Sequence, residues 1–239
     1  MRSRGRGLSG VVTAVGALAL VAALWNGAAA DLMHELFPPA SGQGEGTAVS
    51  AQEVQAAQSA LGGLAVEPLS SEAGYAREQF GQRWADVDRN GCDQRNDALR
   101  AAAVPGTVEI KPGTHGCVVL RAQIEGPYTG ERIEFVKGAS TVDIDHVVPL
   151  SRAWRQGAAG WPEAERERFA NESGNLLAVD ASANRAKGDA GPEEWMPEVG
   201  RCGYVVQWIQ VKQEWELSVT VSEKAAVSEQ LEQCREGEQ

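Results

Sequence analysis

The residues best suited to chemistry lie in two separate segments of the chain. The first segment holds an acid–imidazole pair, Asp145-His146, and the second holds Asn184 and Lys187. Asp and Asn oxygens are hard ligands of the kind that Mg²⁺ prefers. An imidazole whose pKa is near ~6.5 can act as a general base around neutral pH. These residue types indicate metal-assisted hydrolysis of a phosphodiester.

Such a hydrolysis needs a nucleophilic water, a base that takes its proton, and positive charge on the phosphate. We expect Asp145 and Asn184 to hold one divalent ion, either Mg²⁺ or Mn²⁺. His146 would deprotonate the water, and Lys187 could contact a phosphate oxygen. Zinc is not expected, because the three His or Cys ligands that it usually requires are absent from these segments.

Two strands and a helix are needed to position these side chains. Residues 142–148 are rich in β-branched side chains and end at Pro149, which is typical of a strand that leads into a loop. Residues 175–180 are a candidate buried strand, and residues 181–187 read as a helix with Asp180 or Ser182 as the N-cap. Neighbouring strand residues point to opposite faces, so Asp145 and His146 can serve one centre only where the strand ends.

The order of an Asp-His pair, an Asn before a short apolar run and a second Asn opening a helix resembles the HNH nuclease superfamily. Residues 75–234 look like the secreted HNH-family proteins of high-GC bacteria. Residues 144–195 are also similar to the C-terminal nuclease domain of GmrSD-type modification-dependent restriction enzymes. The resemblance implies an α+β fold, in which a ββα-metal core at about 141–190 accompanies a small antiparallel sheet and flanking helices.

The resemblance also implies a role for each matched residue. His146 would be the general base, and Asp145 and Asn184 would be the metal ligands. Asn175 would pin the loop between the two strands and keep the imidazole oriented. Lys187 matches a lysine that such nucleases commonly carry three residues after the last ligand.

The insert between the two strands, residues 151–174, is long and holds the densest group of arginines near the site, and two helices are expected at 152–157 and 162–171. We predict that Arg152, together with Arg185 of the last helix, contacts the substrate. The insert arginines could instead form solvated helix faces. The complete set in the insert is Arg152, Arg155, Arg166 and Arg168.

The first thirty residues have the features of a secretory signal. Arg2, Arg4 and Arg6 precede an apolar run at 11–25, and small residues at 28–30 form a candidate cleavage site. The protein is therefore expected to be secreted and to form no stable membrane association after cleavage. An uncleaved membrane anchor is the rival interpretation. A monomer is expected.

Net charge argues against a nuclease, because the chain carries −11 at pH 7. Removing the signal would take away three arginines and no acid, which makes the remainder more acidic. Affinity for phosphate comes largely from Lys and Arg. We therefore expect weak, non-specific contact with nucleic acid, with DNA favoured over RNA.

Four cysteines follow the signal: Cys92, Cys117, Cys202 and Cys234. An exported chain with an even number of cysteines is expected to form disulfides, and four cysteines allow three pairings. We favour Cys92 with Cys117, which would join a helix to a strand start, and Cys202 with Cys234, which would tie the C-terminal helices together.

The remaining segments complete the predicted organisation. Residues 31–71 read as a flexible linker with a modest helix at 50–61, and residues 72–239 as the nuclease domain. Residues 86–93 read as a turn, although they partly match an EF-hand loop. Strands are expected at 107–110, 117–125 and 132–136, and a C-terminal helical pair at 203–234.

Three functions follow from these patterns. The first is a secreted, metal-dependent HNH endonuclease, because each polar residue falls where one mechanism needs it. The second is a non-catalytic exported binding module on the same fold, which the acidic charge favours. The third is an interbacterial nuclease toxin, for which the chain contains no recognisable delivery domain.

Overall fold

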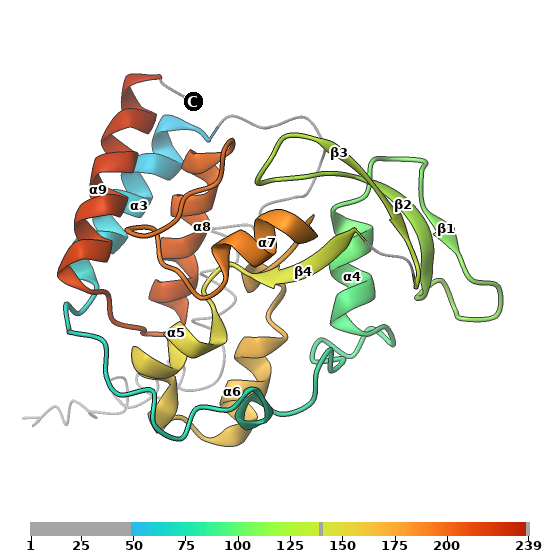
Figure 1. The fold of residues 1–239 in the computed structure, drawn as a ribbon, viewed down its shortest axis with the longest axis horizontal. Coiled ribbons are helices and arrows are strands. Elements are labelled where there is room, and N and C mark those ends of the chain that lie inside the picture. Colours follow the sequence, from blue (N-terminus) through green and yellow to red (C-terminus); the bar gives the residue numbers. More distant parts are fainter. Residues whose placement is uncertain (1–48, 139–140, 238–239) are drawn as a thin grey trace, which may run out of the picture. The chain divides into compact units, whose positions relative to one another are not determined.

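A computed structural model describes residues 49–138 and 141–237 of the chain (Figure 1). The predicted α+β fold class is confirmed, with antiparallel strand pairing in both described sheets. In chain order the elements are α3 (Ala51–Gly63), η1 (Arg77–Phe80), α4 (Gln94–Ala101), β1 (Glu109–Ile110), β2 (Val119–Glu125), β3 (Arg132–Val136), β4 (Val142–His146), α5 (Leu150–Arg155), η2 (Ala158–Gly160), α6 (Glu163–Ala170), η3 (Ser173–Asn175), β5 (Leu176–Asp180), α7 (Ala181–Lys187), α8 (Arg201–Glu214) and α9 (Val221–Glu236).

The larger hydrophobic core lies between α3, α5, α6, α8 and α9. Helix α8 carries Val205, Trp208 and Ile209 at helical spacing, and all three are fully buried. Helix α9 begins with a capping box in which Thr220 and Glu223 satisfy each other's backbone N–H groups. The predicted C-terminal helical pair is therefore present, with α3 beside it (Figure 1).

The helix predicted at 50–61 is present as α3, and its packing corrects the prediction that the described part of residues 31–71 is a flexible linker. Residues 49–71 are part of the folded domain, because Val54, Ala57 and Leu61 are buried in the larger core. Ser50 caps the helix through a capping box with Glu53. The apolar stripe is narrow and rich in Ala, which made the segment read as a tether. Residues 31–48 lie outside the described residues.

A second core lies between the sheet β1-β2-β3, helix α4 and one face of the β4–β5 pair. Strands β2 and β3 pair antiparallel, with Ile124 opposite Ile133. Ala122 and Ile124 are buried and alternate with exposed Arg121 and Gln123 along β2, which is the pattern of a half-buried strand. The three strands predicted from the sequence are present, and β1 and β2 are shorter than expected.

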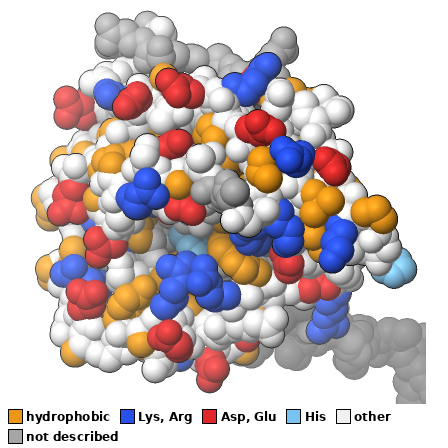
Figure 2. All heavy atoms as spheres, turned by 45° about the vertical axis from the view of Figure 1, so that its right-hand side comes forward, with side chains coloured by type: hydrophobic (Ala, Val, Ile, Leu, Met, Phe, Trp, Pro, Cys, Tyr) orange, Lys and Arg blue, Asp and Glu red, His pale blue; other side chains and the backbone are white. Residues whose placement is uncertain are grey.

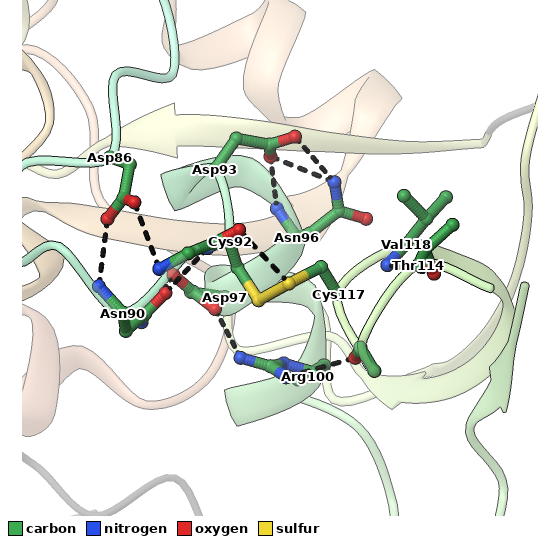
Figure 3. The surroundings of a disulfide bond; sticks show 12 residues. Asp86, Asn90, Cys92, Asp93, Asn96, Asp97, Arg100, Thr114, Cys117 and Val118 are labelled. Carbon is green, nitrogen blue, oxygen red and sulfur yellow. Dashed lines mark hydrogen bonds and ion pairs between the residues drawn. A yellow bond between two sulfur atoms is a disulfide. The ribbon is translucent and has the colours of Figure 1, made fainter.

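Both favoured disulfides are present: Cys92–Cys117 and Cys202–Cys234. The first joins the turn before α4 to the start of β2 (Figure 3). In that turn, the Asp86 carboxylate accepts hydrogen bonds from the backbone N–H groups of Asn90 and Gly91, at 3.0 and 2.9 Å. The segment that partly matched an EF-hand is thus a turn closed by its own side chains.

Two observations bear on the predicted signal and anchor. Within residues 49–138 and 141–237, no helix is long and apolar enough to cross a membrane. The predicted signal at residues 1–30 lies outside the described residues.

Candidate active site

Strands β4 and β5 and helix α7 form the predicted ββα unit. The two strands pair antiparallel, with Asp145 opposite Leu177 and His146 opposite Leu176. Asp180 ends β5 and caps α7, because its carboxylate accepts hydrogen bonds from the N–H groups of Ser182 and Ala183. The turn from β5 into α7 contains no further residues, so α7 packs directly against β4 and β5.

Helix α7 covers two carboxylates that alternate along β4. The Asn184 amide donates to Asp143 Oδ2 at 3.1 Å. Lys187 Nζ lies 2.8 Å from Asp145 Oδ2, and the hydroxyl of Tyr128 donates to that same oxygen at 2.7 Å. Burial raises the pKa of Tyr128 well above its usual value, so this hydroxyl stays protonated as a donor.

This pairing differs from the expected one, in which Asn184 faces Asp145. About one turn of α7 separates Asn184 from Lys187, and Asp143 and Asp145 are two positions apart on β4, with Ile144 between them. These spacings are similar, at about 5 and 7 Å, so the helix sets one polar side chain against each carboxylate. Sequence order alone does not give that register. The predicted role of Asp145 and Asn184 as metal ligands stays a prediction.

His146 lies in a different environment from its neighbour Asp145. Its Nε2 lies 2.8 Å from the carbonyl oxygen of Ala170, and its ring is nearly parallel to that of Trp84. A carbonyl oxygen can only accept, so Nε2 carries the proton and Nδ1 is the acceptor in the neutral ring. Burial lowers the pKa of His146 to about 3, with smaller contributions from nearby cations. The imidazole is therefore neutral at neutral pH.

Asn175 holds the loop that follows β4. Its Oδ1 accepts from the backbone N–H of Val148 at 2.8 Å, and its Nδ2 donates to the Val148 carbonyl at 3.3 Å. The backbone carbonyl of Asn175 also accepts from Val147 N at 2.9 Å. The side chain is fully buried. These contacts fit the predicted pinning role, and the effect of that role on activity stays a prediction.

Lys187 is buried, and its ammonium donates to the His146 carbonyl oxygen at 2.8 Å in addition to its contact with Asp145. Burial lowers the pKa of Lys187, while the Asp145 carboxylate opposes that effect. The ammonium therefore fixes the end of β4 from inside the fold. The predicted contact of Lys187 with a phosphate does not fit this placement.

Arg152 is likewise not at the surface, which corrects its predicted contact with substrate. It is 4% exposed, and its guanidinium pairs with Glu193 and Glu223. Lys212 Nζ lies 3.0 Å from the same Glu223, so these groups form a buried charge network between α5, α8 and α9. A buried arginine whose charge is already compensated has no free face for a phosphate.

The other arginines of the insert and Arg185 of α7 lie in different environments. The Arg166 side chain is bound to backbone carbonyls of Gln79 and Trp161, and Arg155 to that of Ser70. The insert arginines thus hold neighbouring segments, with Arg168 over the Trp215 ring. Arg185 is exposed on α7, next to Asn184, and its contact with substrate stays a prediction.

Comparison with known proteins decides the family. Residues 93–230, more than half of the chain, match the model of the C-terminal domain of GmrSD restriction endonucleases. The chain belongs to this family. An uncharacterized secreted protein of Arthroderma benhamiae is 41% identical over 182 residues, which cover 74% of this chain and 84% of that protein. No solved structure matches the chain.

The GmrSD C-terminal domain family gives the ββα unit a nuclease-type context. The oxygen atoms of this unit can be compared with the ligands that a divalent metal ion requires. Asp143 and Asp145 present carboxylate oxygens on the face of β4 that α7 covers, and Asn184 of α7 directs its amide nitrogen to Asp143 and carries an amide oxygen as a further donor type. In chemical type these donors fit a hard divalent cation. Among the described residues, no three His, Cys, Asp or Glu side chains form a metal-binding group.

Sequence reasoning missed three residues around His146. Arg77, Arg83 and Trp84 line a pocket with His146, Leu150 and Ala170. All three come from a segment that precedes the family match, which begins at residue 93. Isolated arginines in an irregular segment carry no periodic signal. The unusual local feature is that Trp84 has φ 58°, and a sequence does not reveal that angle.

Proposed function

We propose that this GmrSD C-terminal domain is an endonuclease that hydrolyses phosphodiesters of nucleic acid, DNA in the first place, with one divalent ion. We also propose that the protein is exported. Its two disulfides are typical of oxidising compartments, and its relative in Arthroderma benhamiae is described as secreted.

The observation that carries the proposal is the hydrogen bond between His146 Nε2 and the Ala170 carbonyl. It fixes the tautomer in which Nδ1 has a free lone pair, and that lone pair can accept a proton from water. The ring lines a pocket, so a water held between His146 and a substrate phosphate could be deprotonated there. Asn175 supports this role by holding the loop after β4, which keeps the ring oriented.

The divalent ion would be held by oxygens of Asp145 and Asn184, with Asp143 as a further donor beside them. When bound, such an ion stabilises the negative charge that develops on the phosphate and on the leaving oxygen. Tyr128 and Lys187 orient the Asp145 carboxylate, because each donates a hydrogen bond to it.

A resting pKa of about 3 makes His146 a weak base in the free protein. Bound substrate would change this, because a phosphodiester places a negative charge beside the imidazole. An opposite charge favours the protonated ring and raises its pKa. The proposed base therefore gains strength in the substrate complex, where proton transfer is needed.

The test is nicking of supercoiled plasmid by the full chain in Mg²⁺, in Mn²⁺ and in EDTA. The variant is His146→Gln, because a Gln amide can still donate to the Ala170 carbonyl and yet cannot act as a base. We expect a loss of rate of about a hundredfold or more, which is the usual contribution of a general base. Exposed His115 supplies the control, as His115→Asn, which tolerates the left-handed φ of 51° at that position.

Each outcome is informative. A His146→Gln chain that melts like wild type and nicks at the wild-type rate removes His146 from the mechanism. Nicking that persists in EDTA would show that the reaction needs no divalent ion. A wild-type chain that leaves plasmid intact with every ion favours the exported binding module, for which the pairing of Asp145 with Lys187 is the supporting observation.

A further inference from the structure

Residues 75–84, here named the strap, run over α5 and α6 ahead of the family-matched region. The strap is anchored by Phe80, which is 2% exposed and packs among the rings of Tyr75, Trp154 and Phe169 at centroid distances of 6.2 to 6.4 Å. A ring buried in this way fixes its backbone, because moving it would expose a large apolar surface.

Polar contacts fix the two ends of the same turn. Arg166 Nε donates to the carbonyl of Gln79 at 2.7 Å, and Asn171 Nδ2 donates to that of Gln82 at 3.1 Å. Between them, Gly81 has φ +67°, and a Cβ there would lie 2.8 Å from the Glu167 side chain. The strap is therefore held closely against α6, so its next side chains have a defined position.

That position is the mouth of the His146 pocket. Arg77, Arg83 and Trp84 line the pocket, and the Arg83 guanidinium lies over the Trp84 ring at 5.6 Å from its centroid. The Trp84 ring is inclined by only 7° to the His146 ring, at a centroid distance of 6.4 Å. Among the described residues that line the pocket, two are arginines and none is Asp or Glu.

The charges of Arg77 and Arg83 are also uncompensated. Both side chains are exposed, and neither forms an ion pair within residues 49–138 and 141–237. By contrast, Arg100, Arg121 and Arg132 each pair with an acid at the surface. Figure 2 shows Lys and Arg side chains gathered beside a hollow on this face. In a chain of net charge −11, two unpaired guanidinium groups at one pocket indicate an anion site.

We infer that Arg77 and Arg83 are the phosphate-binding residues of this site and hold the backbone of a nucleic-acid strand across His146. The inference rests on the proposed function for the identity of the anion. Arginine suits phosphate because its planar fork can donate two parallel hydrogen bonds. The strap would thus supply the positive charge that the acidic remainder of the protein lacks.

The experiment measures binding separately from cleavage. Fluorescence anisotropy of a labelled DNA oligonucleotide, single-stranded and duplex, is followed in EDTA with the full chain. The variants are Arg77→Gln, Arg83→Gln and the double variant, with Arg83→Lys as a charge-retaining rescue. Arg132→Gln is the control, because Arg132 is exposed and pairs with Glu125 on the β2–β3 hairpin.

We expect the double variant to bind about tenfold more weakly at low salt. The slope of log affinity against log salt should become shallower by about one for each phosphate that the variant no longer binds. Arg132→Gln should bind like wild type, and Arg83→Lys should retain part of the affinity. Unchanged melting temperatures would show that the variants fold.

Plasmid nicking by the same variants separates the two proposals. If wild type nicks and the double variant binds and nicks equally well, the inference about the arginines is wrong and the nuclease proposal stands. If wild type does not nick but its binding depends on both arginines, the nuclease proposal is wrong and the strap remains a nucleic-acid contact. If wild type binds no oligonucleotide, the inference is overturned.

Discussion

At the scale of single residues, the neighbours Asp145 and His146 lie in different electrostatic environments. Asp145 accepts hydrogen bonds from a lysine and a tyrosine, whereas His146 is surrounded by cations and desolvated. Strand alternation explains the difference, because it sends adjacent side chains to opposite faces. The fold thus keeps the imidazole neutral at acidic pH values at which a free imidazole would be protonated.

This environment makes stability depend on pH. The folded-state pKa of His146 is about 3 and lies below the unfolded value near ~6.5, so the unfolded chain binds the extra proton between these pH values. The free energy of unfolding should fall as pH is lowered through this window, by up to about 1.4 kcal/mol per pH unit. Arg77, Arg83 and Lys187 all oppose protonation of this ring.

Urea unfolding at several pH values checks this prediction. Other carboxylates titrate in the same window, so the informative quantity is the difference between wild type and His146→Gln. That difference should shrink on acidification, because the variant has no buried imidazole to protonate. His115→Asn should follow wild type, since His115 is exposed. Parallel curves for wild type and His146→Gln would contradict the assignment.

At the scale of elements, the packing of helix α3 into the core is the clearest departure from expectation, because the helix was expected within a flexible linker. It packs on α8 and α9 through Val54, Ala57 and Leu61. We predict that Leu61→Ala lowers the free energy of unfolding by about 2 to 4 kcal/mol, because it leaves a cavity in the core. Gln55→Ala on the exposed face should change it by less than about 0.5 kcal/mol.

Chemical denaturation of the two variants provides the measurement. A helix that merely tethered a domain would tolerate both substitutions equally. Equal midpoints for Leu61→Ala and wild type would therefore return residues 49–63 to the status of a linker.

The ββα unit shows which structural features can be predicted from the sequence and which cannot. Strand β4 and helix α7 were predictable because β-branched runs, a capping Asp180 and apolar spacing are local signals. The register between them was not, since Asn184 meets Asp143 and Lys187 meets Asp145 through tertiary packing. The burial of Arg152 also depends on partners distant in the sequence, Glu193 and Glu223.

The strap also shows a limit of prediction from the sequence. Arg77 and Arg83 lie in an irregular segment, and only the packing of Phe80 on α6 brings them to His146. No spacing rule connects a short 3₁₀ turn to a strand end more than sixty residues away. Sequence reasoning found the residues that carry a motif and missed the residues that only the fold assembles.

At the scale of the whole molecule, the two disulfides join segments near the two ends of the described domain. Cys202–Cys234 joins α8 to the end of α9 across a separation of 32 residues, and Cys92–Cys117 closes 25 residues. We predict that replacing Cys202 and Cys234 by Ala lowers the free energy of unfolding by about 3 kcal/mol, chiefly because the unfolded chain gains conformational entropy. Urea unfolding of the variant and of wild type, each with and without reductant, provides the measurement.

The second disulfide supplies the matched comparison. Replacing Cys92 and Cys117 by Ala should cost a similar amount, because loop length enters only logarithmically. If reductant leaves the wild-type transition unchanged while the thiols are shown to be free, the bridges contribute nothing to stability.

The position of the strap has a practical consequence for anyone who expresses this protein. The family match starts at residue 93, which makes that residue an attractive place to begin a shortened recombinant chain. Such a chain would retain β4, β5 and α7 but would lack both strap arginines and the tryptophan beside the imidazole. A lack of nuclease activity in that shortened chain would therefore reflect the truncation and not the full-length protein.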